Sequence, residues 1–398
     1  MNRIERLTQE LCPDGVEYLK LGEVLDYEQP GKYIVKSTDY SKDYDTPVLT
    51  AGQSFILGYT DETEGVFLAS KEEPVIIFDD FTTSFHWVDF NFKVKSSAMK
   101  MLRLKEKEGA KTLLRFVFFC MQQIKCTPLE HSRQWISKYS GFEIPVPPLV
   151  IQEKIVEVLD KFTELEAELE AELEARKLQY SYYRDKLLTF SEDTPRMPLE
   201  EVFELRNGYT PSKKNDAFWE GGTIPWFRME DIRENGRELS DAIQHITPAA
   251  VKGKGLFAAG SFIMATTATI GEHALLIVDS LANQRFTNLR IRKSLDSQLD
   301  TRYCFHYLYV LGEWCKQNVN AGGFASVDMG KFRRYPFPIP PLEEQRRIAT
   351  ILDKFERLTT SLQEGIPAEI EARRQQYCYY RDKLLGFRRK DEGAEGSE

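Results

Sequence analysis

The chain has 398 residues, of which 42% are hydrophobic and 29% charged, a composition that excludes a low-complexity protein and predicts two or three globular domains. Its formal net charge of −9 argues against a uniformly basic nucleic-acid-binding surface, but residues 151–190 alone carry 6 Lys/Arg against 10 Asp/Glu, so charge by itself excludes no partner. No apolar run reaches the roughly 18 residues of a transmembrane helix, and the polar N-terminus does not resemble a signal peptide, so we expect a cytoplasmic protein.

The first block of the chain, residues 1–147, contains a short apolar stretch that invites a metal-site interpretation. This stretch, VIIFDDFTTSF (75–85), reads as a strand that ends in the carboxylates of Asp79 and Asp80. A carboxylate pair alone is weak support for a metal, and no Glu-x-Lys follows to complete a nuclease pattern. We therefore favour a turn or hydrogen-bonding role for the two aspartates.

The next segment, residues 148–190, predicts one unusually long helix. The pair Pro147-Pro148 ends the first block, and no Gly or Pro interrupts residues 149–190. Apolar residues recur at gaps of three, four and seven, as on one face of a helix, which would run about 55–60 Å.

Inside this predicted helix, LEAE-LEAE-LEAR (165–176) repeats a unit of four residues. Each unit adds about 6 Å and about 400° of rotation, so units could be added or removed while the apolar face keeps its direction. The alternative is that Leu/Glu/Ala runs are simply good helix formers with a solvated acidic face.

A second block, residues 191–340, is followed by a second copy of the helical segment at 341–387. PVPPLVIQEKIVEVLDKF aligns with PIPPLEEQRRIATILDKF, and YSYYRDKLLTF matches YCYYRDKLLGF at nine of eleven positions. Each of the two predicted helices has one apolar face, which needs an apolar partner along its whole length. An antiparallel pair formed by these two helices within the chain is the simplest solution. We expect the second helix to break near Gly365-Ile366-Pro367 and the tail, residues 388–398, to be disordered.

These features resemble the specificity subunit of a type I restriction-modification system. The resemblance covers nearly the whole chain and rests on the twin PPLxxQxxI, LDKF and YxYYRDKLLxF motifs, the tetrapeptide repeat, and GYTPS…FWEGGTIPW (208–226). It implies an α+β fold with two α/β target-recognition domains, 1–147 and 191–340, on two long antiparallel helical spacers and an internal pseudo-twofold repeat. The family's repeat commonly begins with Thr or Ala, whereas this one is rich in Glu, which leaves the gap length unassigned.

The resemblance also implies a function. In that family each domain reads half of an asymmetric, interrupted DNA site, and repeat number sets the unread gap. The chain itself would be non-catalytic and hold no cofactor and no metal. Two modification subunits would transfer the methyl group from S-adenosylmethionine, and restriction subunits would join to translocate and cut DNA. The repeated docking candidates are Tyr182, Tyr183, Arg184, Tyr379, Tyr380 and Arg381, although helix packing explains the tyrosines equally well.

A surface that reads DNA needs two kinds of side chain. Arg and Gln can pair with base edges, whereas Lys and hydroxyl groups suit phosphates, although a single surface Lys or Thr is more often only solvated. In the first block the candidates are Gln29, Lys32, Tyr33, Lys36, Gln53, Thr82, Thr83, Lys93, Lys95, Ser96, Ser97, Arg133 and Gln134. In the second block they are Tyr209, Thr210, Ser212, Lys213, Lys214, Trp226, Arg228, Thr266, Thr267, Thr269, Asn283, Gln284 and Arg285. Trp226 is better explained as a loop anchor than as a base-stacking group.

The main alternative class is a self-sufficient DNA methyltransferase or nuclease. An amino-methyltransferase needs an Asn/Asp-Pro-Pro-aromatic loop, and neither Pro-Pro pair of this chain has that context. No GxxxxGK[ST], HExxH or GxSxG motif occurs, the five histidines are far apart, and the six cysteines include no CxxC pair, which predicts buried, reduced thiols. A related two-subunit enzyme with a fused cutting and methylating chain would use a similar recognition subunit. A purely structural helical linker would leave the two blocks unexplained.

Overall fold

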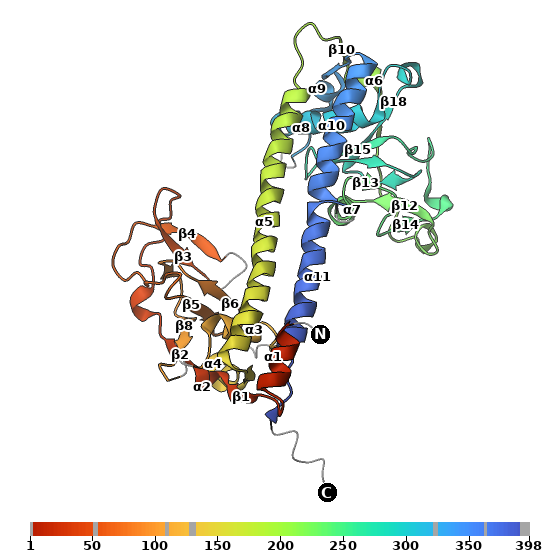
Figure 1. Ribbon diagram of the computed structural model, residues 1–398. Coiled ribbons are helices and arrows are strands. Elements are labelled where there is room, and N and C mark those ends of the chain that lie inside the picture. Colours follow the sequence, from red (N-terminus) through yellow and green to blue (C-terminus); the bar gives the residue numbers. More distant parts are fainter. Residues whose placement is uncertain are drawn as a thin grey trace. The chain divides into compact units, whose positions relative to one another are not determined.

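The computed structural model describes residues 3–50, 55–107, 111–126, 133–320, 325–361 and 364–390, and the statements below concern those residues (Figure 1). They belong to two compact units. The first consists of Met1–Glu170 with Ile370–Glu398, and the second of Ala171–Glu369. Among the described helices, none is long and apolar enough to cross a membrane.

The first unit contains a four-stranded antiparallel sheet and a three-stranded mixed sheet. The larger sheet has the order β2-β8-β5-β6, and the smaller one has the order β4-β3-β7 with β3 and β7 parallel. A separate antiparallel pair, β1 and β9, joins the start of the block to its end. The strands are β1 (Glu17–Lys20), β2 (Leu25–Glu28), β3 (Thr46–Leu49), β4 (Ile56–Thr60), β5 (Val75–Asp79), β6 (Phe85–Val88), β7 (Lys93–Val94), β8 (Met99–Leu104) and β9 (Glu143–Val146).

The second unit repeats this arrangement with one additional strand. Its larger sheet has the order β11-β18-β15-β16-β13, and its smaller sheet has the order β14-β12-β17 with β12 and β17 parallel. The pair β10 and β19 again joins the start of the block to its end. The strands are β10 (Arg196–Pro198), β11 (Phe203–Asn207), β12 (Ile224–Phe227), β13 (Glu238–Leu239), β14 (His245–Ile246), β15 (Phe262–Ala265), β16 (His273–Leu276), β17 (Leu281–Ala282), β18 (Phe286–Ile291) and β19 (Pro336–Pro338).

Helices connect and cover these strands. The α-helices are α1 (Arg3–Leu11), α2 (Leu21–Val24), α3 (Leu114–Met121), α4 (Gln134–Ser137), α5 (Leu149–Leu187), α6 (Leu199–Val202), α7 (Met229–Asn235), α8 (Thr301–Gln317), α9 (Met329–Arg333), α10 (Leu342–Thr360) and α11 (Ile366–Leu384). Five 3-10 turns complete the described structure: η1 (Gly31–Tyr33), η2 (Tyr139–Gly141), η3 (Asp216–Phe218), η4 (Pro248–Ala250) and η5 (Lys293–Leu295).

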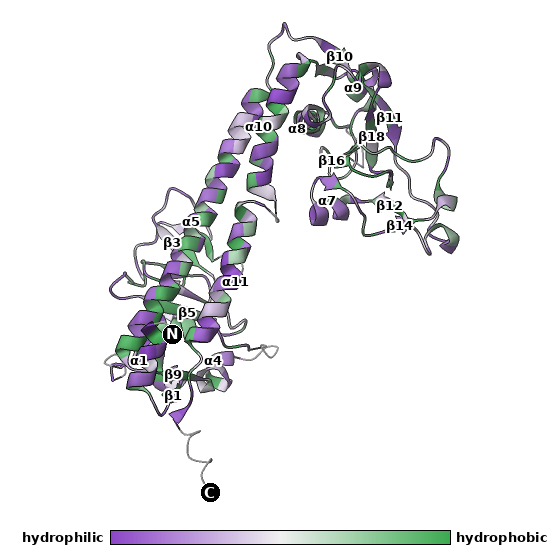
Figure 2. Cartoon of the chain, turned by 45° about the vertical axis from the view of Figure 1, so that its right-hand side comes forward, coloured by the Kyte–Doolittle hydropathy of each residue, from purple (hydrophilic) through white to green (hydrophobic). Residues whose placement is uncertain are grey.

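The spacer helices pair in antiparallel fashion inside each unit, as the sequence predicts. In the first unit Phe162 of α5 stacks on Tyr380 of α11 with ring centroids 5.6 Å apart, while Arg374 bonds to Glu166 and Glu170 further along α5. Residue numbers therefore rise along α5 as they fall along α11. In the second unit Tyr183 of α5 stacks on Phe355 of α10 at 5.5 Å. Apolar and polar residues alternate along all three helices (Figure 2).

The predicted break in the second helical segment is also confirmed. Helix α10 ends at Thr360 and α11 begins at Ile366. Pro367 lies in the first turn of α11, where its missing N–H group costs nothing because no carbonyl precedes it in the helix. A Cβ atom on Gly365 would lie 2.5 Å from the carbonyl oxygen of Arg357, so the chain can approach α10 this closely only at a glycine.

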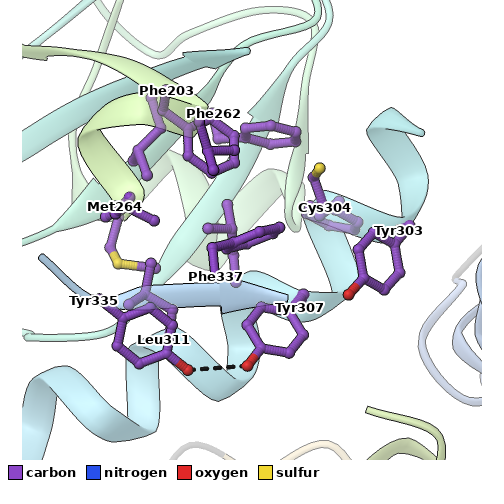
Figure 3. Close-up of a cluster of buried hydrophobic side chains, with 14 of the residues drawn as sticks. Phe203, Phe262, Met264, Tyr303, Cys304, Tyr307, Leu311, Tyr335 and Phe337 are labelled. Atoms are coloured by element: carbon purple, nitrogen blue, oxygen red, sulfur yellow. Dashed lines mark hydrogen bonds between the residues drawn. The ribbon is translucent and has the colours of Figure 1, made fainter. Parts of the chain in front are cut away.

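One hydrophobic cluster explains how the second block is held on its helices (Figure 3). Phe203 and Phe262 from the sheet meet Phe337 of β19 and the inner face of α8, and Ile348 and Leu352 of α10 belong to the same cluster. The hydroxyl groups of Tyr307 and Tyr335 lie 3.0 Å apart inside it, so each buried phenol has a partner.

Two equivalent glutamines fix the start of each spacer helix. Gln152 donates to the carbonyl oxygens of Lys111 and Pro147 and accepts from Leu113, and its side chain is fully buried. Gln345 donates to Gln298 and Pro340 and accepts from Asp300 in the same way. A buried amide with both its groups bonded can be replaced only at the cost of unsatisfied backbone groups. The repeated PPLxxQ motif therefore encodes one helix-seating contact used twice.

Three expectations need correction. Residues 388–390 of the tail are not disordered, because Val16 and Arg389 form a parallel bridge and Lys390 donates to the Val16 carbonyl oxygen; 391–398 lie outside the described residues. Leu165 is one of the apolar residues that recur along the predicted helix over 149–190 and were expected to pack against a partner, but its side chain is 45% exposed. Cys378 is exposed, and Cys12 and Cys126 are partly exposed, whereas Cys120, Cys304 and Cys315 are buried as expected; none of the six cysteines forms a disulfide.

Candidate nucleic-acid interface

In the second unit, three loops that carry most of the candidate residues lie together. They follow β11 (208–214), connect β15 to β16 (266–272) and connect β17 to β18 (283–285). Backbone hydrogen bonds join them, because Tyr209 donates to the Ala282 carbonyl oxygen and Thr266 donates to that of Arg285, both at 2.9 Å. Thr210 bonds to Gln284 through its side chain. We call these residues the second loop cluster.

The second loop cluster presents side chains suited to DNA. Lys213, Lys214, Ser212, Gln284 and Arg285 are exposed. Arg and Gln can make paired hydrogen bonds to guanine and adenine, while lysine and hydroxyl groups neutralise or bond to phosphates. Thr267 and Thr269 are partly exposed in the hairpin between β15 and β16.

Other candidates of the second block hold the loops of this cluster in place, and their side chains are buried or hydrogen-bonded within the fold. Trp226 is 2% exposed, and its indole N–H donates to the Tyr209 carbonyl oxygen at 3.0 Å, so it anchors the loop as the sequence suggested. The Tyr209 hydroxyl donates to the Ala250 carbonyl oxygen. Asn283 accepts from the backbone N–H of Arg285, and Arg228 is half-buried beside Asp231. Thr266 is 7% exposed, with its hydroxyl 3.0 Å from that of Thr287.

In the first unit the candidates gather in the equivalent loops. The stretch after β2 is joined to the end of β7 because Val35 donates to the Val94 carbonyl oxygen at 3.0 Å. The hairpin between β5 and β6 is joined to the loop before β8, because Asp80 donates to the Ala98 carbonyl oxygen at 3.0 Å. The backbone N–H of Gln134 donates to the Asp80 carbonyl oxygen, which brings Arg133 beside the hairpin. The members of this first loop cluster that are exposed are Gln29, Lys32, Lys36, Thr82, Ser96, Ser97 and Arg133.

Two of the first block's candidates are buried. Lys93 is 1% exposed, with its ammonium group 3.0 Å from a Glu62 carboxylate oxygen and 2.6 Å from the Glu64 carbonyl oxygen. Gln134 is fully buried. Together with Trp226 and Thr266, these residues cannot present their side chains to DNA, so the interface proposed below excludes all four.

The remaining first-block candidates are partly engaged within the fold. Tyr33 donates its hydroxyl hydrogen to Glu28, which also pairs with Lys32 at 2.9 Å. Lys95 donates to the Tyr40 hydroxyl at 3.1 Å. Thr83 is half-buried in its hairpin, and Gln53 lies outside the described residues.

The same hairpin carries an unusual backbone conformation in both units. Thr83, between β5 and β6, has φ +60°, and Ala268, between β15 and β16, has φ +65°. Left-handed backbone is uncommon for residues other than glycine, and least favoured for β-branched ones. Such conformations persist only where surrounding contacts impose them. The hairpins are therefore held in one shape at the centre of each loop cluster.

Asp79 and Asp80 have the structural role that the sequence favoured. One carboxylate oxygen of Asp79 accepts from the backbone N–H groups of Phe81 and Thr82, both at 2.8 Å, and so fixes the turn. Asp80 accepts from the backbone N–H of Trp135 at 2.8 Å and pairs with Lys100 at 3.2 Å. The Asp80 and Lys100 side chains are 2% and 1% exposed, which makes this a buried ion pair beneath the hairpin.

The repeated tyrosines divide into two kinds. Tyr183 and Tyr380 stack on Phe355 and Phe162 in the helix pairs. Tyr182 and Tyr379 instead point outward and are 61% and 63% exposed. Each packs edge-on against its neighbour, at 5.4 Å and 75° in one unit and 5.3 Å and 76° in the other.

The arginines that follow these tyrosines differ in surroundings. Arg184 is 9% exposed and lies over the Tyr309 ring at 3.5 Å. Its counterpart Arg381 is half-buried and pairs with Asp382 at 2.8 Å. Both guanidinium groups are thus occupied within their own unit, and the repeated exposed feature is the outer tyrosine of each copy.

A charged network ties α8 to α10 in the second unit. Arg302 and His306 both bond to Asp353, at 2.6 Å and 2.7 Å, and Arg237 pairs with Glu356. Burial opposes ionisation of Asp353, but the hydrogen bonds from His306 and Arg302 outweigh it and hold its pKa at about 2. His306, Asp353 and Glu356 lie close enough together to suggest metal ligands, but guanidinium groups already neutralise both carboxylates.

Sequence inspection missed residues that border the loop clusters. Ser326 forms a bridge with Thr267, in the position that Arg133 occupies in the first unit. Asn207, at the end of β11, accepts from the Thr287 hydroxyl at 3.3 Å. Asn207 immediately precedes the GYTPS stretch, so extending that stretch by one residue would have found it.

Two units of one topology, each with a polar loop cluster and each carried by paired helices, define a protein with two equivalent recognition modules. The chain matches the family described as type I restriction modification DNA specificity domain twice, over residues 13–175 and 192–372. It belongs to that family and is a specificity subunit.

Two of the three similar proteins described here match almost the whole chain. It is 44% identical to the EcoR124I/EcoR124II specificity subunit of Escherichia coli, over 97% of this chain and 98% of the relative. It is 48% identical to the EcoprrI specificity subunit of Escherichia coli over 54% of each chain. The crystal structure of the S subunit from M. genitalium shares the fold, with a TM-score of 0.56 at 13% identity over 93% of this chain and 96% of that one.

Proposed function

We propose that this chain reads a two-part, asymmetric DNA site for a type I restriction-modification complex, with one half-site read by each loop cluster. The observation that carries the proposal is the duplication itself. Topologically equivalent units place chemically similar but differently composed loops in the same positions, as expected of two modules that read different bases. We assign residues 1–147 and 191–340 to the two modules.

Within each module, different side chains have different tasks. Arg285 and Gln284 in the second unit, and Arg133 in the first, are the proposed base-reading residues. Lys213, Lys214 and the hydroxyl groups beside them hold phosphates, which fixes the register but carries no sequence information. A protein that releases counterions from phosphates binds less tightly as salt rises, so this second group should determine the salt dependence.

The chemistry belongs to partner subunits in this proposal. Two modification subunits bind one chain, methylate adenine and carry S-adenosylmethionine, and restriction subunits join them. The support is the pair of matching outer tyrosines, Tyr182 and Tyr379, whose exposure and edge-on packing agree closely. Such a pair offers two similar anchors to two copies of one partner, since aromatic side chains are enriched at binding hot spots. A DNA-reading subunit acts where chromosomal DNA is, so we place it in the cytoplasm.

The test is methylation mapping in a host free of adenine methylation. The chain is expressed with its modification subunit, and the modification subunit alone is the control. An interrupted asymmetric motif containing N6-methyladenine should appear only when this chain is present. An assembled complex that leaves DNA unmethylated would overturn the proposal.

Two variants then assign the half-sites. Replacing residues 191–340 with the corresponding block of a relative should change one half of the motif only, and a change in both halves would contradict modular reading. Arg285→Ala should relax one base of the second half-site by about 5- to 150-fold, the range expected for a lost bidentate contact of about 1–3 kcal/mol. Lys293→Ala is the matched control, because Lys293 is exposed beyond the opposite end of β18.

A further inference from the structure

The glutamate-rich repeat makes a specific contact with the second spacer helix. Arg374 of α11 donates from Nε to Glu166 at 2.5 Å and from its terminal nitrogen to Glu170 at 2.7 Å. All three residues belong to the first unit. One guanidinium group therefore joins α11 to two carboxylates on neighbouring turns of α5.

The two carboxylates come from the same position of successive repeats. Glu166 is the second residue of LEAE 165–168, and Glu170 is the second residue of LEAE 169–172. The other glutamates of the repeat are used differently. Glu172 pairs with Arg176 and Glu174 with Lys177, both along α5 itself, while Glu168 is exposed and has no ion-pair partner among the described residues.

The spacing of this contact equals the period of the repeat. If Leu169–Glu172 were deleted, Glu174 would follow Glu166 by four residues and would take the position of Glu170. If one more LEAE unit were inserted after Glu172, Glu170 would keep its position four residues after Glu166, and the second glutamate of the new unit would follow Glu170 by a further four residues. In both altered chains the two glutamates stay four residues apart on the unchanged start of α5, so their direction toward Arg374 is kept, and only the residues that follow are rotated by about 40° beyond a full turn per unit.

We propose that Arg374 is a register residue, which holds α11 on whichever two second-position glutamates face it, so that the spacer can change length by whole repeats without losing this contact. The contact itself is independent of DNA; only its consequence for the unread gap rests on the proposed function. The proposal gives the glutamates of this repeat a task that Thr or Ala could not perform.

The test compares hydrogen exchange of α11 amides in three chains: the full-length protein, the protein lacking 169–172, and the protein with one additional LEAE unit after Glu172. Arg374→Ala should raise exchange in α11 by about two- to fivefold in all three, the size expected for a partly exposed ion-pair network. The paired variant Glu166→Lys with Glu170→Lys should raise it at least as much, and adding Arg374→Glu should restore protection. Glu168→Lys is the matched control and should change little.

Each outcome decides the proposal. An effect of Arg374→Ala in the full-length chain that disappears in both altered lengths would refute the register role, and no effect in any chain would refute the contact. Two altered lengths are included so that misfolding of one leaves the other informative. Methylation mapping of the same chains should show gaps that differ with repeat number. Absence of methylation would count against the proposed function, whereas the exchange result would stand by itself.

Discussion

The buried pair of Asp80 and Lys100 provides the sharpest test of how the first loop cluster is held. Both side chains are almost fully buried, and the ammonium group also lies 4.3 Å from the centre of the Tyr27 ring. Lys100→Met preserves most of the side-chain volume but leaves the Asp80 carboxylate buried without its cation. Breaking a buried ion pair in this way costs about 3–5 kcal/mol, a large part of a typical total stability of about 5–15 kcal/mol.

Replacing Asp80 alone, and replacing Asp80 and Lys100 together, extend this prediction. Asp80→Asn keeps an acceptor for Trp135 and leaves an ammonium group that retains its contact with Tyr27, so it should cost less than Lys100→Met. The double variant removes both charges and should be more stable than Lys100→Met alone, because the main penalty in the single variant is the unpaired charge.

The assay is urea unfolding of the purified chain, followed by methylation mapping with the modification subunit. Lys161→Met is the control, since its pair with Glu157 is 67% and 49% exposed and should contribute at most about 1 kcal/mol. Because Asp80 also holds the hairpin and the Arg133 segment, folded Lys100→Met protein should lose discrimination in one half-site only. The reasoning would be refuted if Lys100→Met unfolded within about 1 kcal/mol of the control, or if the two single costs simply added.

Three further predictions concern other contacts. Burial, and to a smaller extent the neighbouring guanidinium charge of Arg237, lowers the pKa of His273 from 6.5 to about 3. The neutral imidazole therefore contributes fully to the free energy of unfolding above pH 6.5, and this contribution declines as the pH falls toward 3. His273→Gln should make the urea midpoint depend less on pH between about pH 7 and 4. The pKa of Asp353 is about 2, so the stability that its ionised form adds is present above pH 3.8 and is lost as the pH falls toward 2. Arg302→Met should lower the free energy of unfolding by about 2–4 kcal/mol, and adding Asp353→Asn should restore part of this loss in the same urea assay. Tyr182→Ala and Tyr379→Ala should each remove one modification subunit from the complex by native mass measurement, and retention of both copies in the double variant would contradict the docking assignment.

The long spacer helices could be predicted from the sequence. The predicted helix over 149–190 is observed as Leu149–Leu187, and the predicted break lies between Thr360 and Ile366. Long apolar periodicity and Pro/Gly interruptions are local signals, so they need no knowledge of partners. The matching sheet orders could not be read in this way, because strands of two to six residues pair through contacts distant in sequence.

The candidate interface was predicted to the level of loops but not of side chains. The chosen stretches do converge in each unit, yet Lys93, Gln134 and Thr266 point inward. Side chains alternate between the two faces of a strand, so the burial of Lys93 in β7 and of Thr266 just after β15 depends on register, which the sequence does not reveal. Gln134 is instead the first residue of helix α4. Trp226 was correctly suspected as an anchor because a large indole with one N–H donor commonly needs a buried partner.

The contacts of individual residues explain which parts of the sequence are repeated in the two halves of the chain and which parts differ. Gln152 and Gln345 bond to equivalent backbone groups in the two units, so any other side chain would leave those groups unpaired, and the surrounding motif occurs twice. At the positions beneath the hairpins, the structure restricts the choice of side chain less strongly. The first unit uses the charged pair of Asp80 and Lys100, whereas the second uses the hydroxyl groups of Thr266 and Thr287. Both solutions hold the hairpin, and they leave its exposed loops free to differ, which two modules reading unlike half-sites require.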